Sequence, residues 1–259
     1  MNLLFFDFDG TLHVPQTNQV SKKTIESLHK LRKKGDLVFI NTGRCYSSLE
    51  VQLHGVPVDG VICGCGTLIS YHDTIVYRAD ASINQRQKVL EALRKYRVDA
   101  FLEGHEDLYC DRTYSDRLDK VTQFFERVNV LMKNVEDPHF SFSKMSLYYE
   151  SEEQKQAFEK SLEKDFDFIH FPNLKSEAVL KSHSKATGMR KIATLLDFPI
   201  EKCIAFGDSD NDSDILLAAS QSVLIGENAP HLKDIVSLQA PCAKEEGVTW
   251  ALKKLKLID

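Results

Sequence analysis

The chain has 259 residues, of which 42% are hydrophobic and 27% are charged, as in an ordinary globular protein. That length is enough for one large α/β domain or two smaller ones with a substantial buried core. The net charge of −5 lacks the basic surplus of a nucleic-acid-binding protein. No apolar run is long enough to cross a membrane, and the chain does not start with a signal-peptide pattern, so we expect a cytoplasmic protein without a membrane partner.

The first part of the chain alternates short apolar runs with helical patterns. Apolar runs at residues 3–6, 37–40 and 60–63 predict buried strands. A helix is predicted over 21–35, beginning at an N-capping serine and ending at a glycine, and a short helix is predicted near 47–53. This alternation is typical of a parallel, doubly wound sheet.

From about residue 74 to 180 the pattern changes, because strand-like and helical segments no longer follow the same regular alternation. Strands are predicted at 74–78, 100–102, 108–110 and 143–149, and helices near 83–96, 114–127 and 151–163. These elements indicate a separate α+β module.

After Lys185 the first pattern returns. Strands are predicted at 203–206 and 223–225, and helices near 187–197, 213–219 and 245–256. The simplest organisation is an α/β core with a doubly wound parallel sheet, built from residues 1–80 and 183–259. An inserted α+β domain at 81–182 interrupts this core.

Four polar clusters lie where apolar strands end or a helix begins. They are Asp7 with Asp9, Thr42 with Gly43, Lys185, and Asp208 with Asn211 and Asp212. In open α/β sheets, ligands bind outside the carboxyl ends of the strands. We therefore expect these clusters to meet at one edge of the sheet.

Asp7 and Asp9 are two residues apart, so in an extended chain their side chains leave the same side. One carboxylate can act as a nucleophile and the other as a general acid and base. Their mutual repulsion calls for a nearby cation, and Mg²⁺ prefers oxygen ligands of this kind. The simpler alternative is a surface turn formed by Asp-Phe-Asp-Gly.

The run Gly207-Asp208-Ser209-Asp210-Asn211-Asp212 concentrates three carboxyl groups and one amide. Capping of a helix N-terminus explains part of this composition, whereas a metal ion would explain the concentration of charge. The hydroxyl and backbone N–H groups of Thr42 and Gly43 can hold phosphate oxygens, and Lys185 can screen phosphoryl charge. Taken alone, Thr-Gly is more often a turn, and a single lysine is more often a solvated surface residue.

Together these motifs resemble those of the haloacid dehalogenase (HAD) superfamily of phosphatases, specifically the Cof-type sugar-phosphatase group with a large inserted cap. The resemblance covers essentially the whole chain. It rests on the residues 7–11, Asn41-Thr42-Gly43-Arg44, Lys185 and the run 207–212.

The resemblance implies a Mg²⁺-dependent phosphohydrolase that acts on a small phosphorylated metabolite, such as a sugar phosphate or a nucleotide or cofactor monophosphate. Asp7 would form an aspartyl-phosphate, and Asp9 would protonate the leaving oxygen and later activate water. The implied metal ligands are Asp7, the backbone carbonyl of Asp9 and Asp208, with Asp212 supporting the ion from behind. The implied phosphate-binding residues are Thr42, Gly43, Lys185 and Asn211.

Two positions depart from the family pattern. Cys65-Gly66 stands where the family often has Asn-Gly, and Lys185-Ala186 stands where it often has Lys-Gly. The inserted domain would close over the site and select the leaving group. Its polar candidates for substrate contact, which the sequence does not rank, are Glu103, His105, Asp111, Arg112 and Lys144.

Three alternatives stay open at this point. A phosphomutase would use the same nucleophile, and a non-catalytic metabolite-binding or regulatory protein could share the fold. A dehalogenase is disfavoured because it has no need of Asp9 or of the acidic run near Asp208. The sequence leaves the oligomeric state, monomer or dimer, undecided.

Overall fold

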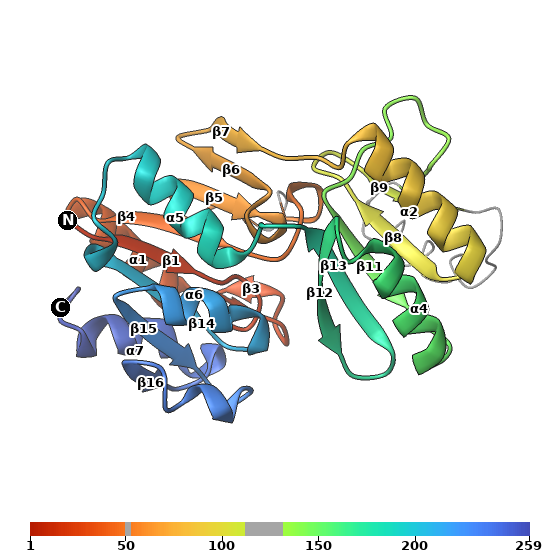
Figure 1. The fold of residues 1–259 in the computed structure, drawn as a ribbon. Helices are drawn as coiled ribbons and strands as arrows, with labels where there is room; N and C mark the ends of the chain where they lie inside the picture. Colours follow the sequence, from red (N-terminus) through yellow and green to blue (C-terminus); the bar gives the residue numbers. More distant parts are fainter. Residues whose placement is uncertain (50–52, 112–131) are drawn as a thin grey trace. The chain divides into compact units, whose positions relative to one another are not determined.

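The computed structural model describes residues 1–49, 53–111 and 132–259, and the chain separates into two compact units. The first unit contains the chain up to Arg44, the stretch that ends at Tyr77, and Ser184–Asp259. The second contains the described part of Arg78–His183 and a short stretch that begins at Cys45. Figure 1 labels the helices and strands of both units.

An eight-stranded sheet forms the centre of the first unit. Its strands are β1 (Leu3–Phe6), β4 (Leu37–Asn41), β5 (Gly60–Cys63), β6 (Leu68–Tyr71), β7 (Thr74–Arg78), β14 (Cys203–Gly207), β15 (Gln221–Ile225) and β16 (Leu238–Ala240). The strand order is β16-β15-β14-β1-β4-β5-β6-β7. Every pairing from β16 to β5 is parallel, and β6 then runs antiparallel to β5.

Four helices accompany this sheet: α1 (Lys22–Lys33), α5 (Lys185–Leu195), α6 (Ser213–Ala218) and α7 (Gly247–Lys254). Met189 of α5 and Ile215 of α6 share a buried cluster with Phe5 and Phe39 of the sheet. Helices α1 and α7 form a second contacting pair, with α1 against β4 and α7 against β15 and β16. Helix α1 begins after Ser21, whose hydroxyl accepts a hydrogen bond from the N–H of Thr24, so the predicted N-cap is confirmed.

The predicted fold class, a doubly wound α/β core with an additional α+β region, is confirmed. The antiparallel end of the core sheet was not predicted. Strand β7 carries the pattern of residues 74–78 that the sequence placed at the start of the middle region, but it pairs with β6 at the edge of the large sheet. A separate two-stranded ribbon follows β1, formed by β2 (His13–Val14) and β3 (Gln19–Val20).

The second unit is built on a six-stranded sheet. Its strands are β8 (Asp99–Glu103), β9 (Leu108–Cys110), β10 (Met132–Asn134), β11 (Lys144–Tyr148), β12 (Phe166–Phe171) and β13 (Lys175–Leu180), in the order β10-β9-β8-β11-β13-β12. The helices α2 (Ile83–Tyr96) and α4 (Glu152–Leu162) contact one another. Strands β12 and β13 were not predicted, whereas the bounds of α2 match the predicted helix.

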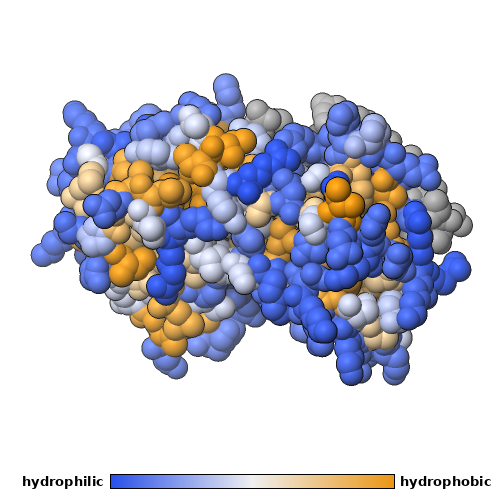
Figure 2. Space-filling view, turned by 45° about the horizontal axis from the view of Figure 1, so that its top comes forward, coloured by the Kyte–Doolittle hydropathy of each residue, from blue (hydrophilic) through white to orange (hydrophobic). Residues whose placement is uncertain are grey.

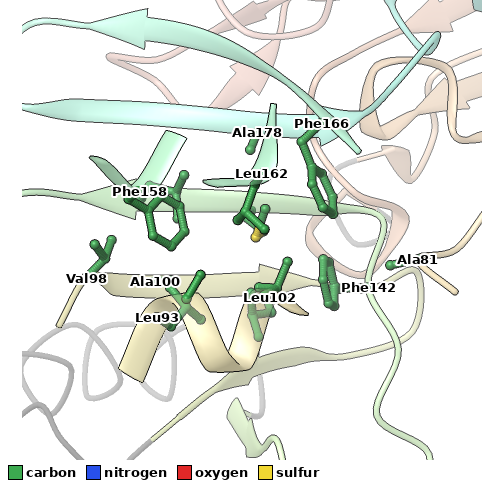
Figure 3. Packing of buried hydrophobic residues seen from close by; sticks show 14 of the residues in the cluster. Ala81, Leu93, Val98, Ala100, Leu102, Phe142, Phe158, Leu162, Phe166 and Ala178 are labelled. Carbon is green, nitrogen blue, oxygen red and sulfur yellow. The ribbon is translucent and has the colours of Figure 1, made fainter. Parts of the chain in front are cut away.

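Alternate strand residues and both helices build the core of this unit. Ala100 and Leu102 of β8 pack with Leu93 of α2 and with Phe158 and Leu162 of α4 (Figure 3). Because strand side chains alternate between faces, the intervening residues of β8 point to the other face of the sheet. That face carries a small cluster of Phe101, Leu108, Cys110 and Met132.

Two predicted helices involve positions outside the described residues. The helix predicted at 114–127 lies entirely outside them, and so does Arg112. In the described residues around the short helix predicted near 47–53, a 3₁₀ turn spans Tyr46–Ser48.

The visible surface is largely hydrophilic, with smaller hydrophobic areas between the polar residues (Figure 2). Among the described residues, no helix combines the length and the apolar character that crossing a lipid bilayer requires.

Candidate active site

The parallel pairing of β1 with β14 brings Asp7 and Asp208 to the same edge of the core sheet. Asp7 follows the last residue of β1, and its N–H donates to the carbonyl of Phe206 at 2.8 Å, which continues the ladder. Asp208 follows the last residue of β14. Both residues therefore lie at the carboxyl ends of adjacent strands, as the sequence predicts.

Lys185 joins this edge from the first position of α5. Its Nζ donates to Oδ1 of Asp7 at 2.6 Å and to Oδ1 of Asp212 at 2.5 Å. The lysine is 1% exposed, so these contacts are shielded from solvent. Ser184 caps the helix in a reciprocal capping box with Thr187, which fixes the backbone that carries the lysine.

Burial dominates the electrostatics of this cluster. It raises the pKa of Asp7 well above the ordinary value, with Lys185 acting in the opposite direction and Asp212 adding to the rise. Burial alone would lower the pKa of Lys185, but the carboxylates of Asp212 and Asp7 outweigh it and raise that pKa. Burial and then the charge of Asp212 raise the pKa of Asp208 to about 6. The cluster places one lysine among three carboxyl groups.

Asp212 is fully buried and holds the loop after β14 in place. Its Oδ2 accepts hydrogen bonds from the N–H groups of Asp208 at 3.0 Å and Ser209 at 3.2 Å. A Cβ at position 207 would lie 2.5 Å from Cβ and Cγ of Asp212, so this approach needs glycine at that position. Asp212 thus connects the loop backbone to Lys185.

Asp208 has two hydrogen-bond partners that sequence reasoning did not assign to it. Thr11 Oγ1 donates to Oδ1 at 3.4 Å, and Asn228 Nδ2 donates to Oδ2 at 3.2 Å. Thr11 belongs to the recognised run 7–11, so its place in the motif was a usable signal. The sequence around Asn228 contains no pattern that indicates a site residue. Asn228 reaches the site because β15, the strand before it, lies beside β14 in the sheet.

The acidic residues of this cluster fit a hard divalent cation. Asp7, Asp208 and Asp212 each offer one carboxylate oxygen, and these three oxygens all lie within 4.8 Å of one another. An all-oxygen donor set of this kind suits Mg²⁺. Asp212 already accepts hydrogen bonds from Lys185 and from two backbone N–H groups. Asp212 accepts three hydrogen bonds and has no exposed surface, whereas Asp7 and Asp208 accept fewer and keep a little exposure, so direct ligation suits Asp7 and Asp208 better, with Asp212 supporting them.

The predicted phosphate-binding residue Thr42 follows β4 and is 1% exposed. Its N–H donates to the carbonyl of Ile62 at 2.9 Å, and its Oγ1 accepts from the N–H of Arg44 at 3.1 Å. The hydroxyl oxygen accepts in this contact, so its own proton is available for donation to a ligand. Gly43 lies between these two residues and is half-buried.

Cys65 occupies the family's usual asparagine position. It adopts a left-handed conformation with φ of 53°, and its N–H donates to the carbonyl of Thr42 at 3.1 Å. Although the residue type differs from the family pattern, the backbone turn at Cys65 hydrogen-bonds to Thr42 at the end of β4.

Asn211 is half-buried in the short 3₁₀ turn that follows Asp208. Its Oδ1 accepts a hydrogen bond from Oγ of Ser209 at 2.9 Å, which directs the amide nitrogen away from that hydroxyl.

Asp9 differs from Asp7, because its side chain contacts Arg44 rather than the buried cluster. Arg44 donates from Nε to Oδ2 and from Nη2 to Oδ1 of Asp9, both at 2.6 Å. His13 Nδ1 lies 3.4 Å from Oδ1. The side chain of Asp9 is 39% exposed, so this carboxylate is accessible to solvent.

The polar candidates of the second unit lie in contacts within that unit. Lys144 Nζ is 3.0 Å from Glu177 and 3.6 Å from Glu103, while Asp111 accepts from Arg94 at 2.7 Å. The ring of His105 contacts the carbonyl of Ala79. Their predicted role in substrate selection stays a prediction.

The sequence from residue 4 to 252 matches the family model described as haloacid dehalogenase-like hydrolase. The chain belongs to this family. The predicted resemblance is thereby confirmed, and so, at the level of the family, is the prediction of a phosphatase enzyme.

Relatives and solved structures of this hydrolase agree with that assignment. YkrA from Bacillus subtilis, which carries a provisional phosphatase name, is 24% identical over 99% of this chain and 98% of its own length. The Bacillus subtilis 5-amino-6-(5-phospho-D-ribitylamino)uracil phosphatase YitU is 25% identical over 97% and 96%. The structure of BT1666 from Bacteroides thetaiotaomicron superimposes with a TM-score of 0.87 at 24% identity, covering 100% of this chain and 96% of BT1666. This structural likeness supports the fold.

Proposed function

We propose that this hydrolase removes phosphate from a small phosphorylated metabolite, using Asp7 as the nucleophile and Mg²⁺ as cofactor. The observation that carries the proposal is the buried carboxylate of Asp7, held by Lys185 at 2.6 Å and within 4.8 Å of oxygens of Asp208 and Asp212. Such a set of one lysine and three carboxyl groups around a strand end suits phosphoryl transfer, in which charge on the phosphoryl oxygens needs fixed cations and donors.

In the first step, a carboxylate oxygen of Asp7 attacks the phosphorus atom. The bond from phosphorus to the ester oxygen breaks, and Asp9, acting as a general acid, gives its proton to that oxygen. The products of this step are the free alcohol and an acyl phosphate on Asp7.

In the second step, water attacks the phosphorus atom of this acyl phosphate. Asp9, now a carboxylate, accepts the proton of the water, and inorganic phosphate leaves. The carboxylate of Asp7 and the protonated form of Asp9 are both restored, so the net reaction consumes one water per ester.

The remaining site residues bind the transferring group. Lys185, the hydroxyl of Thr42, the backbone N–H of Gly43 and the amide of Asn211 would donate to phosphoryl oxygens. Asp7, Asp208 and the backbone carbonyl of Asp9 would hold Mg²⁺, with Asp212 supporting them. The ion would supply positive charge that offsets the charge of the phosphoryl group.

The substrate class we propose is an alkyl phosphate on a small metabolite, either a sugar or polyol phosphate or a cofactor monophosphate. The name of YitU describes a phosphate on a ribityl chain, which is a polyol phosphate. The alcohol released from such an ester is a poor leaving group, so an acid at the position of Asp9 is chemically useful. We assign the choice among these substrates to the second unit.

The test is phosphate release from a panel of monoesters, with and without Mg²⁺, for the wild type and for Asp7→Asn. The panel contains ribose 5-phosphate, glucose 6-phosphate, flavin mononucleotide, pyridoxal phosphate and p-nitrophenyl phosphate. We expect Mg²⁺-dependent release that falls by at least about 10³-fold in Asp7→Asn, because the shape is kept and the nucleophile is lost.

Unchanged thermal unfolding of the variant would show that the loss is chemical. Appreciable turnover by Asp7→Asn would contradict the nucleophile assignment. Transfer of phosphate to a second hydroxyl of the substrate, rather than to water, would indicate a phosphomutase. No release from any ester by folded, Mg²⁺-loaded protein would favour the non-catalytic alternative.

A further inference from the structure

The carboxylate of Asp9 lies in the fork of one arginine side chain. Nε and Nη2 of Arg44 each donate to a different oxygen of Asp9, both at 2.6 Å. A bidentate pair of this kind fixes the plane of the carboxylate as well as its distance, which a single contact does not do. The mechanism proposed above uses Asp9 for proton transfer but assigns no task to Arg44.

The chain around Asp9 also restricts its position. The N–H groups of Leu12 and His13 donate to the carbonyl of Phe8 at 3.1 and 2.8 Å, and Gly10 N–H donates to the carbonyl of His13 at 3.0 Å. This tight loop brings Nδ1 of His13 to 3.4 Å from Oδ1 of Asp9. His13 is 4% exposed, and its ring stacks on the ring of Phe8 with 5.1 Å between the centroids.

Arg44 is itself fixed to the strand end that would bind phosphate. Its N–H donates to Oγ1 of Thr42 at 3.1 Å, and its carbonyl accepts from the N–H of Gly64 at 2.7 Å. Its guanidinium lies 5.7 Å from the ring centroid of Phe8. One residue thus contacts Thr42 through its backbone and Asp9 through its side chain.

We propose that Arg44 is a positioning residue for Asp9. It holds the carboxyl group of the general acid and base at a fixed place relative to the phosphate-binding residue Thr42. His13, at the other end of the loop that carries Asp9, contacts the same carboxylate. This inference rests on the function proposed above, because it gives Arg44 a task only if Asp9 transfers protons.

The proposal predicts a dependence on the leaving group. Proton donation by Asp9 matters for an alkyl phosphate, whose alkoxide is a poor leaving group, and matters little for p-nitrophenyl phosphate, whose phenolate leaves unaided. The ratio kcat/KM covers only the steps up to formation of the acyl phosphate on Asp7. A displaced Asp9 should therefore lower kcat/KM for the alkyl ester selectively, whereas general damage to the site lowers it for both.

The experiment measures kcat/KM for p-nitrophenyl phosphate and for the panel's best alkyl phosphate in Arg44→Gln and Arg44→Lys. We expect Arg44→Gln to lose about 10- to 100-fold on the alkyl ester and less than about threefold on p-nitrophenyl phosphate. Arg44→Lys keeps the charge but not the fork, so it should restore part of the loss.

Arg32→Gln is the matched control. Arg32 pairs with Asp59 in the same unit, with Nε donating to Oδ1 at 3.0 Å, and neither residue belongs to the proposed machinery. We expect its kcat/KM to equal that of the wild type for both esters.

The outcomes separate this inference from the proposed function. If Arg44→Gln, with a wild-type unfolding midpoint, slows both esters equally or neither, Arg44 does not act through Asp9 and the inference is wrong. If Arg44→Gln is too unstable to assay, Arg44→Lys carries the same test, with a selective loss on the alkyl ester expected. A wild type that cleaves no ester would instead overturn the proposed function.

Discussion

Each of the two units buries a lysine between two carboxylates, but the two clusters are built in different ways. In the second unit, Lys144 and Glu103 are register partners on β11 and β8, and Glu177 lies on β13 at the other side of β11. In the first unit, Lys185 begins a helix and meets Asp7 and Asp212 across 178 and 27 residues of sequence. Strand register brings the second unit's cluster together, whereas loops at the edge of the sheet bring the first unit's cluster together.

The two clusters also differ in their carboxyl groups. In the second unit, Ser146 Oγ donates to Oε1 of Glu103 at 2.7 Å, whereas Lys144 faces Oε2. Residues on adjacent strands of one sheet therefore hold both oxygens of Glu103. In the first unit a third carboxyl group, Asp208, lies beside the pair, and its pKa is raised to about 6 by burial and by Asp212. The surplus of carboxyl groups around Lys185 supports the proposed cation site. A set paired by register is satisfied by the fold itself.

The strongest test of this distinction replaces each lysine by methionine. Lys185→Met should lower turnover of p-nitrophenyl phosphate by at least about 100-fold, because a fixed cation at the phosphoryl group is lost. Lys144→Met should leave that turnover within about threefold. Both variants should lose about 3 kcal/mol of unfolding free energy, since each leaves buried carboxylates unpaired. Steady-state kinetics and denaturant unfolding of the two variants check these values.

Equal loss of activity in both variants would break the comparison and would give Lys144 a part in the reaction. Unchanged activity in Lys185→Met would remove the lysine from the proposed phosphate-binding set.

The second test uses the backbone, because a glycine of the first unit lies directly against Asp208. Gly10 has a φ of +84°, and a Cβ there would lie 2.4 Å from Oδ2 of Asp208. Gly35 has a φ of +88° with no atom within 4 Å of such a Cβ. Gly10→Ala should raise the Mg²⁺ concentration for half-maximal activity by about tenfold, since it displaces a proposed ligand. Gly35→Ala should cost about 1 kcal/mol of stability and leave the Mg²⁺ titration unchanged.

The Mg²⁺ titration of phosphate release is the measurement for both variants. Superimposable titrations for Gly10→Ala and the wild type would argue against Asp208 as a ligand.

The sequence predicts the parallel strands β1, β4, β5, β14 and β15 of the core sheet. It also predicts the approach of Asp7 and Asp208, because apolar strands end directly before them, and it places Lys185 near the start of a helix at the same edge. It does not predict β12 or β13. Both form a hairpin in which Asn173 and Leu174 take positive φ, and the exposed side chains of β12 interrupt its apolar pattern. Strand β13 also pairs with β11, which lies much earlier in the chain, and that pairing leaves no local signal in the sequence.

The partner of Asp9 shows the same limit within the site. Arg44 belongs to a recognised motif, but nothing near it in sequence indicates which carboxylate its guanidinium will meet. Asn228 has even less local signal, since it reaches Asp208 only because β15 lies beside β14. Residues at strand ends are predictable from the fold rule, whereas side chains that reach them from other loops depend on packing.

The smallest expected effect concerns His105 in the second unit. Burial lowers its pKa below the ordinary value of 6.5, despite the contact of its ring with the carbonyl of Ala79 and the nearby charge of Asp80. A lowered folded pKa means that its contribution to stability is complete above pH 6.5 and is lost as the pH falls through the folded pKa. We therefore expect the unfolding midpoint of the wild type to fall more steeply below that pH than the midpoint of His105→Gln.

The control is His139→Gln, a change at an exposed histidine of the same unit, which should reproduce the wild-type slope. Calorimetric midpoints measured between about pH 7 and 5 check the difference, because the contributions of groups that do not interact with His105 cancel between variant and wild type. The rate of p-nitrophenyl phosphate hydrolysis at neutral pH should be equal in the wild type, His105→Gln and His139→Gln. Parallel slopes for His105→Gln and the wild type would show that this ring is not held neutral by burial.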